Sequence, residues 1–184
     1  MADTTHVKGL SELQKLMDTL PAKVEANIMR GALRRGVNVI MARAKQLVPV
    51  SPANSENARL YGGYAGALRD SIKVSTRLKN GKVTGSVKAG GKTKSGADVF
   101  YAHMVEFGTA AHGITSRLRR LLTFGGSFFR SVNHPGARPR PFMRPAMDAE
   151  AQAAVIAAGE YMKTRLATKQ GLDTTHIMIE GDEL

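Results

Sequence analysis

The sequence contains no cysteine and no tryptophan, and aromatic residues make up only 5% of its 184 residues. The absence of cysteine excludes disulfide bonds and Cys-ligated zinc or iron–sulfur sites, and it agrees with synthesis in a cytoplasm. With so few aromatic side chains, the core must be built from Leu, Val, Ile, Ala and Met. The hydrophobic fraction of 42% is ordinary for a globular protein, and the length suits one domain.

Long hydrophobic runs are also missing. No run of about 18 apolar residues predicts a transmembrane helix. The N-terminal stretch "MADTTHVKGL" lacks the apolar segment of a secretory signal. We therefore expect no membrane-spanning segment, and of the acidic partners that the charge suggests we expect no membrane.

Negative charge is scarce and unevenly placed. The chain has 27 Lys and Arg against 15 Asp and Glu, a formal net charge of +12. Residues 171–184 hold four of the acids and no Lys or Arg, so that residues 1–170 carry +16. A basic body with an acidic tail predicts an acidic partner, which would be nucleic acid, a membrane surface or an acidic patch on another copy. A charge that serves only solubility is the alternative.

Apolar residues recur at helical spacing in three stretches of the chain. Residues 9–20 predict a first helix, and residues 22–48 predict a second and longer one that Pro49 ends. A third helix is expected from about Pro145, which suits a first helical turn, to residue 169.

Three strands are expected between the second and third helices. Residues 71–78 and 82–89 alternate apolar and polar, and Asn80-Gly81 between them is a strong hairpin signal. Residues 99–107 are apolar at both odd and even positions, which predicts a strand covered on both faces, or on one face and by a neighbouring subunit on the other. The order of elements predicts an α+β fold, in which an antiparallel sheet of about three or four strands packs against long N-terminal and C-terminal helices.

The expected domain organisation is one α+β domain over residues 1–170, with long loops at 51–65 and 108–137. Residues 118–129 within the second loop predict a short helix or strand. The acidic tail, residues 171–184, is expected to order only on assembly, so that truncation after Gln170 would leave a folded monomer but weaken assembly. Its segment 176–179 either pairs as an edge strand or stays disordered.

The stretch "HMVEFGTAAH" at residues 103–112 raises the question of a metal or catalytic site. In a strand, His103 and Glu106 point to opposite faces, and His103 and His112 are too far apart for a His-Glu-x-x-His site. No Gly-x-Ser-x-Gly motif occurs, and "KAGGKTKSG" lacks the ending of a phosphate-binding loop. We therefore expect no catalytic, metal or cofactor site, and we expect that the protein is not an enzyme.

Glu106 is the only acid between Asp98 and Asp148, and residues 107–147 contain seven Arg and no Lys. A lone carboxylate in an apolar strand is costly unless it is paired, and the planar guanidinium of Arg matches it well. We therefore expect Glu106 to pair with Arg140 or Arg144, within the subunit or across a subunit boundary. The alternative is that Glu106 lies at the solvent end of the strand.

Three motifs occur in order behind a helix that ends in "AKQLVPV": "GALRDSI" at 66–72, "YAHMVEFGT" at 101–109 and "RPRPFMRPAM" at 138–147. Over about residues 8–165 the chain resembles the tail-component family of temperate tailed phages. Members of that family are counted among minor tail or tail-completion (neck) proteins, comparable in role to the minor tail protein Z of lambda. The chain departs from the pattern at the insertion 51–65 and has no Thr before Gly66.

The resemblance implies a structural protein of the virion and not an enzyme. It implies a small α+β domain that assembles, in the host cytoplasm, into a homo-oligomeric ring with sixfold or twelvefold symmetry. The ring would lie at the head–tail junction or the top of the tail, against adjacent neck or tail proteins, with packaged DNA passing through it or stopping near its axis. The basic loops would contact either that DNA, nonspecifically, or acidic surfaces of the adjacent proteins. The alternative is a free nonspecific nucleic-acid-binding protein.

The sequence and the resemblance together give three sets of candidate residues. The expected subunit or partner interface consists of Tyr101, Glu106, Phe107, Arg140, Phe142 and Arg144. Contacts with DNA or an acidic partner are expected from Arg117, Arg119, Arg120 and Arg130. The structural motif consists of Gly66, Leu68, Arg69, Gly108, Pro141 and Pro145, and the two prolines form with Phe142 a knob that could enter a neighbouring copy.

Overall fold

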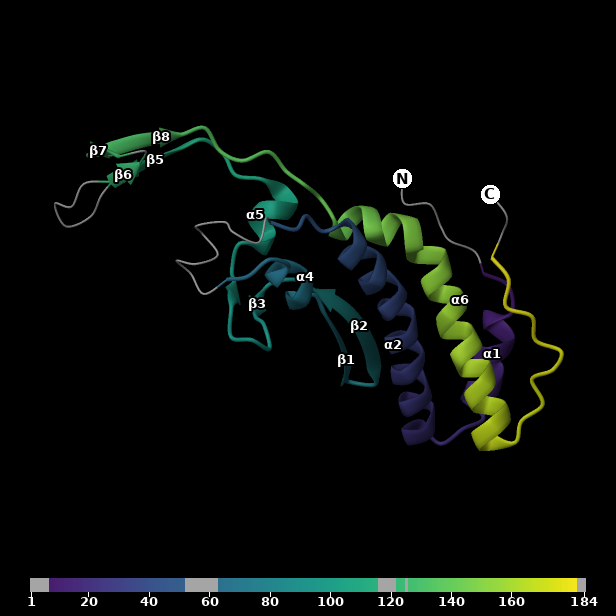
Figure 1. Ribbon diagram of the computed structural model, residues 1–184. Coiled ribbons are helices and arrows are strands. Elements are labelled where there is room, and N and C mark those ends of the chain that lie inside the picture. The colour runs from purple at the N-terminus through teal and green to yellow at the C-terminus, as the bar shows by residue number, and fades with distance from the viewer. Residues whose placement is uncertain (1–6, 52–62, 116–121, 125, 182–184) are drawn as a thin grey trace.

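Figure 1 shows the computed structural model, which describes residues 7–51, 63–115, 122–124 and 126–181. The helices are α1 (Leu10–Asp18), α2 (Ala22–Leu47), α4 (Ala67–Ser71), α5 (Ala102–Phe107) and α6 (Met143–Gln170). The strands pair antiparallel, in the order β1 (Lys73–Lys79) with β2 (Lys82–Lys88), β3 (Gly91–Lys92) with β4 (Asp98–Val99), β5 (His112–Thr115) with β8 (Ser131–His134), and β6 (Leu122–Phe124) with β7 (Ser127–Phe129).

The α+β fold with long helices near both ends of the chain is confirmed. The expected sheet of three or four strands is not found as one unit, because the described strands form four separate two-stranded sheets. Helix α2 lies between the β1–β2 hairpin and α6 (Figure 1). This arrangement puts two layers on opposite sides of one long central helix.

Helices α2 and α6 approach each other closely because small residues line their contact. A Cβ atom added to Gly36 of α2 would lie 2.6 Å from the carbonyl oxygen of Ala154 in α6. That distance is shorter than any ordinary carbon–oxygen contact, so a larger residue at position 36 would push the helices apart. Ala32 and Ala154 are buried at the same contact.

The β1–β2 hairpin turns at Asn80-Gly81, as the sequence predicts. Both residues have positive φ angles, 51° for Asn80 and 75° for Gly81, and this pair of conformations is the one that a two-residue hairpin turn favours. The inner face of the hairpin packs on α2, where a Cβ added to Gly85 would lie 3.0 Å from Val37. The side chains of the other face therefore point away from the helices.

The expected strand at residues 99–107 is wrong. Only Val99 belongs to a strand, and residues 102–107 form α5. The buried residues Ala102 and Glu106 lie four apart on one helical face, and the exposed His103 and Phe107 lie four apart on another. A short segment that is apolar at both odd and even positions fits a helix as well as a covered strand, so periodicity alone could not separate the two.

The described part of residues 109–137, called the arm below, forms an antiparallel ribbon of β5 with β8 and β6 with β7, where the sequence predicted a loop. The sequence also predicted a short helix or strand at residues 118–129, and the described residues of that range form the strands β6 and β7, while residues 118–121 lie outside the described part. Figure 1 shows the arm projecting away from the helices. Its base is closed by two backbone hydrogen bonds between Thr109 and Ala137, with N···O distances of 3.0 and 3.1 Å. The arm therefore leaves α5 and returns toward α6 at nearly the same place.

The buried apolar residues form two clusters along the α2–α6 pair. One cluster gathers the C-terminal half of α2, α4, α5 and the start of α6, with Phe142, Ile72 and Val99 almost fully buried. The other gathers α1, the N-terminal half of α2 and the C-terminal half of α6, with Leu13 and Leu166 fully buried. The two long helices run antiparallel and contribute to both.

The chain after α6 is not a free tail over its described part. Ile177 and Ile179 are buried in the second cluster, and the N–H group of Lys8 donates to the carbonyl oxygen of Glu180 at 3.0 Å. Val7 and Gly181 form an isolated antiparallel bridge. The expectation that this segment orders only on assembly is therefore wrong for residues 171–181, because its alternate isoleucines supply core.

Two other expectations fall partly outside the described residues. Positions 52–62 of the 51–65 insertion and the last three residues of the chain are not described. Within the part that is described, no helix combines the length and the apolarity needed to cross a bilayer.

Candidate functional site

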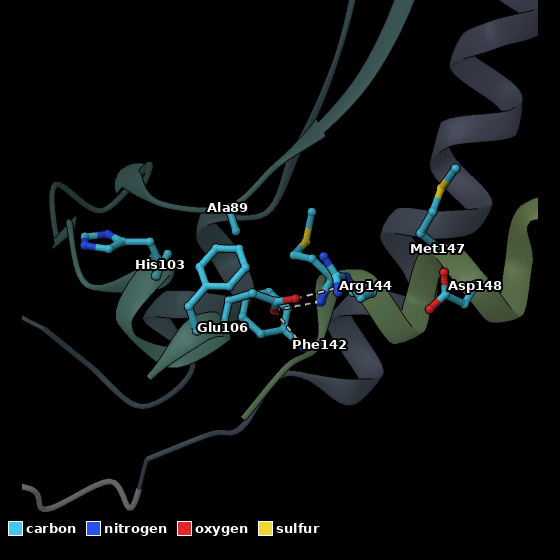
Figure 2. A pocket seen from close by; sticks show the side chains of 10 residues that line it. Ala89, His103, Glu106, Phe142, Arg144, Met147 and Asp148 are labelled. Carbon is cyan, nitrogen blue, oxygen red and sulfur yellow. Dashed lines mark hydrogen bonds between the residues drawn. The ribbon is translucent and has the colours of Figure 1, made fainter. Parts of the chain in front are cut away.

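Glu106 caps the N-terminus of α6. Its Oε2 accepts hydrogen bonds from the N–H groups of Phe142 and Met143, at 2.8 and 3.0 Å, and its Oε1 accepts one from the N–H group of Arg144 at 3.1 Å (Figure 2). The first N–H groups of a helix have no partner within the helix, and a negative charge near them is favourable. A side chain of α5 thus supplies the cap that Phe142, the residue at the N-cap position, does not.

The same contacts set the charge of Glu106. Burial alone raises the pKa of this carboxyl, but hydrogen bonds from the N–H groups of Met143, Phe142 and Arg144 and the positive charge of Arg144 offset that effect. The resulting pKa of Glu106 lies below the usual value for glutamate. A carboxylate that is ionised and holds three N–H groups is suited to binding backbone, and it is a poor proton donor.

The expected ion pair between Glu106 and the side chain of Arg140 or Arg144 is not formed within the subunit. Arg144 meets Glu106 through its backbone N–H, and the exposed Arg140 donates its own N–H to the carbonyl oxygen of Val105 at 2.8 Å. Among the described residues, the one ion pair joins Arg69 and Asp70 at 4.0 Å. Pairing of these arginines across a subunit boundary stays a prediction.

The histidines of the 103–112 stretch do not gather around Glu106. In Figure 2 the imidazole of His103 points away from the carboxylate. His112 lies on the arm, where its ring faces that of His134 with the centroids 5.1 Å apart. Across the ranges that the structure describes, no three His, Asp or Glu side chains are placed to hold a metal ion.

A cavity of about 520 Å³ opens beside Glu106. It brings together four of the expected interface residues, Glu106, Phe107, Phe142 and Arg144, and it is also lined by Met143, Met147 and Asp148. Phe107 is 71% exposed and Met147 is 51% exposed, whereas Phe142 is fully buried. An open, mostly apolar hollow with an exposed aromatic ring at its edge is suited to contact with another protein surface.

A second cavity, of about 570 Å³, also borders α5. Its lining contains Tyr101 and Arg140 of the expected interface together with Gly66 and Leu68 of the structural motif. Burial, and then the neighbouring Tyr64, raise the pKa of Tyr101. The six expected interface residues are therefore divided between two hollows that share α5 as a wall.

The structural-motif residues have local roles that their types explain. Gly66 (φ 88°) precedes α4, whose Leu68 is buried while Arg69 is exposed. Gly108 (φ 73°) follows α5, and a Cβ added there would lie 2.6 Å from the carbonyl oxygen of Ala137. Only glycine fits that approach of the two ends of the arm.

Pro141 and Pro145 flank the start of α6. Pro145 lies in its first turn, where the missing N–H of proline costs nothing. Pro141 is exposed. The expected knob is therefore only partly available to a neighbour, because Phe142 between the two prolines is in the core.

Of the four arginines expected to meet DNA or an acidic partner, Arg117, Arg119 and Arg120 lie outside the described residues. Arg130 is exposed on the arm between β7 and β8. The arm also exposes Phe128 at 68%. Sequence reasoning missed this aromatic, as it missed Met147 and Asp148, although Gly125-Gly126 before Phe128 is a hairpin signal.

Residues 11–108 match the family described as "Bacteriophage HK97-gp10, putative tail-component". The matched range runs from α1 through α5 and ends where the arm begins. It contains the 66–72 motif and all but the last residue of the 101–109 motif, and it stops before the 138–147 motif. Comparison with curated proteins and with solved structures finds no match.

Proposed function

We propose that this chain, which belongs to the HK97-gp10-like family of bacteriophage tail components, is a tail-completion or neck protein that forms a ring. The ring would lie at the head–tail junction or the top of the tail of a tailed phage, with DNA passing through it. Its work would be structural and not catalytic. It would join the virion after assembly in the host cytoplasm, between adjacent neck or tail proteins.

The observation that carries the proposal is the apolar surface around α5. Phe107 of α5 and Met147 of α6 line one hollow and are more than half exposed, and Met104 of α5 is exposed as well. Large apolar side chains gathered in one place on a surface usually mark a site of protein contact. Glu106 holds this helix against α6, so the surface is presented by a fixed part of the body.

The arm offers a second surface, which differs in shape from the α5 surface and is complementary to it. It exposes Phe128 and Phe129 together with Arg130, whereas the hollow at α5 has the carboxylate of Asp148 at its edge. Two different but complementary surfaces produce head-to-tail contacts, and such contacts close into a ring when the rotation between copies allows it. We propose that the arm of one copy lies on α5 of the next.

Assembly of the purified chain tests the proposal. We expect wild-type protein to form closed particles, measured by light scattering after size exclusion and seen by electron microscopy. Phe107→Ser should abolish them while leaving the helical circular dichroism unchanged, because the side chain is exposed. Met178→Ser is a matched control, since Met178 is 65% exposed outside both surfaces. Normal rings from Phe107→Ser protein would contradict the proposal.

A mixing experiment tests the head-to-tail geometry itself. A Phe107→Ser copy keeps its arm, and a Phe128→Ser copy keeps its α5 surface. One intact junction is then possible between the two, so an equal mixture should give heterodimers, whereas each variant alone stays monomeric. Heterodimers are not expected if both phenylalanines belong to one two-fold contact. The copy number, sixfold or twelvefold, follows from the particle mass.

The place in the virion needs a separate measurement. Density for this chain in an electron-microscopy map of the complete particle, at the junction or the top of the tail, would agree with the proposal. Density elsewhere would contradict it. The alternative of a free nucleic-acid-binding protein predicts micromolar or tighter binding to DNA by the unassembled chain at physiological salt, which gel shifts across a salt series would detect.

A further inference from the structure

The outer face of the β1–β2 hairpin carries only positive charge. Between Asp70 and Asp98 the sequence has seven Lys and Arg and no Asp or Glu. The register places five of these cations on one face of the hairpin, in the pairs Lys73 opposite Lys88, Lys79 opposite Lys82, and Arg77 opposite Thr84. Ser75 opposite Ser86 completes the face. The surface is therefore a ladder of ammonium, guanidinium and hydroxyl groups.

Packing fixes which way this face points. The other face of the hairpin carries Val74, Val83 and Val87 and lies against α2, where Gly85 allows close approach to Leu33 and Val37. A slip by one residue would bury the lysines. Figure 1 shows the hairpin on the side of α2 away from α6, so the cationic ladder faces outward from the body.

The ladder has no counter-charge of its own. None of its five cations forms an ion pair within the described part of the chain. Lys73 donates to the carbonyl oxygen of Lys92 at 2.6 Å, which brings the β3 strand and its positive charge to the edge of the same surface. Glu25 and Lys23 line a hollow at the hairpin tip together with Leu78 and Val83, which are inner-face residues.

Like charges placed directly opposite each other on two strands destabilise a hairpin. Lys73 with Lys88 and Lys79 with Lys82 are two such pairs at the two ends of the ladder. The fold tolerates that cost in the free chain, and an anionic partner spread over the whole length of the face would relieve it.

We infer that the outer face of the β1–β2 hairpin, through Lys73, Arg77, Lys79, Lys82 and Lys88, binds the sugar–phosphate backbone of duplex DNA without reading its sequence. Phosphate contacts come from Lys, Arg, Ser and Thr side chains, the groups this face presents. An acidic protein would need a partly apolar core to its interface, and this face offers no apolar or aromatic side chain. The inference extends the proposed function, because it assigns the surface that DNA meets in the ring.

The hairpin inference and the expectation for the arm arginines are distinct. Arg130 lies on the arm next to exposed phenylalanines, a setting that suits protein contact, whereas the ladder has none. If both surfaces met DNA, removing either would reduce binding. DNA binding must come mostly from the ladder if the hairpin is the DNA-binding surface.

A salt titration with matched variants tests the inference. The first variant replaces Lys79, Lys82 and Lys88 with Gln, and the control replaces Lys8, Lys15 and Lys169, three exposed lysines outside the hairpin, with Gln. Both lose three charges. Binding of each to a short fluorescein-labelled duplex is followed by anisotropy from about 50 to 200 mM salt.

We expect the hairpin variant to lower the slope of log K against log salt by about 2 to 3, since each lost phosphate contact removes about 0.9. The control should keep the wild-type slope. The hairpin variant should also unfold at no lower temperature than wild type, because it removes opposed like charges. GC-rich and AT-rich duplexes should bind equally.

Three results would overturn the inference. They are an equal loss of slope in both variants, an unchanged slope in the hairpin variant, and displacement of the duplex by polyglutamate at equal charge concentration, which would assign the face to acidic protein. Light scattering on the same samples tests the ring separately from DNA binding by the hairpin. A wild-type chain that never assembles contradicts the ring, while the slope comparison still decides the role of the hairpin.

Discussion

Large apolar side chains are buried at one end of the α2–α6 helix pair and exposed at the other. At the end formed by α1 and residues 171–181, Leu13, Met17, Leu166 and Ile177 are all fully buried. At the end formed by α5, Phe107, Met147 and Met104 are exposed, although Phe142, which lines the same cavity as Phe107 and Met147, is fully buried. The first end completes the fold of one chain, and the second presents apolar surface that one chain does not cover.

This difference separates residues that hold the monomer together from residues available to a neighbour. Substitutions at the closed end should act on the free energy of unfolding of the single chain. Substitutions of exposed residues at the open end should act on association and leave the monomer unchanged. The four experiments below test that separation.

The largest effect is expected from removing the closed end. Truncation after Gln170 deletes Ile177 and Ile179, and burial of each isoleucine contributes about 1.5–3 kcal/mol. We therefore expect a loss of about 3–6 kcal/mol, seen by urea denaturation as a monomer that is largely unfolded. Truncation after Gly181 is the control and should change stability by less than about 0.5 kcal/mol. A stable monomer ending at Gln170 would show that residues 171–181 do not stabilise the fold.

Two phenylalanines at the open end should behave differently. Phe142→Ala should lower the free energy of unfolding by about 3–5 kcal/mol, because it leaves a cavity in the core. Phe107→Ala, on the exposed side of the same cavity, should change the free energy of unfolding by less than about 0.5 kcal/mol. Chemical denaturation of both variants at low protein concentration gives the comparison. Equal losses would mean that Phe107 belongs to the monomer core and not to a contact surface.

Glu106 joins the exposed helix to the core, so its effect should lie between these extremes. Glu106→Gln keeps the size of the side chain and removes the charge that three N–H groups share, and we expect a loss of about 1.5–3 kcal/mol. Asp148→Asn, which removes an exposed acid near the start of α6, should cost less than about 0.5 kcal/mol. If the two variants unfold alike, the cap contributes nothing to the monomer.

The pH dependence of stability should reveal the same cap. Because the pKa of Glu106 is lower in the folded chain than its ordinary value, its stabilising effect is complete above the ordinary glutamate pKa. The effect is lost as the pH falls through the lower, folded-state value. We expect the difference in stability between wild type and Glu106→Gln to be constant near neutral pH and to shrink in the acid range below about pH 4.5. A difference that grows in acid would contradict a lowered pKa.

Local chemistry made part of the fold predictable. The Asn80-Gly81 turn needs two left-handed residues, a demand that can be read from two letters of sequence. The long helices repeat their apolar pattern many times, so α2 and α6 were expected close to their observed ends. The 99–107 segment is too short for such repetition, and its helix depends on packing that residue types do not reveal.

The sequence indicated Glu106 as a candidate site residue, but it did not reveal the groups that Glu106 binds. Glu106 stands out in the sequence as a lone acid, and the expectation that it needs a partner was sound. Its partners are N–H groups of residues 142–144, which every residue except proline has, so no residue type signals them. Their position depends on where α6 starts relative to α5, which is a property of the whole fold. The burial of Ile177 and Ile179 was missed for the same reason.

The hydrogen bonds between Glu106 and the start of α6 act as a clasp across the base of the arm. They are joined there by the hydrogen bonds of Val105 with Arg140 and of Thr109 with Ala137, so these bonds of the described chain, which align α5 with the start of α6, all lie at or before the point where the arm departs. The length of the ribbon beyond the clasp is then free to vary, since even doubling a loop costs only about 0.6 kcal/mol. Two chains with the same body can therefore carry arms of different reach, and in the proposed ring an exchange of arms between relatives would change the spacing of neighbouring subunits without a change to the body.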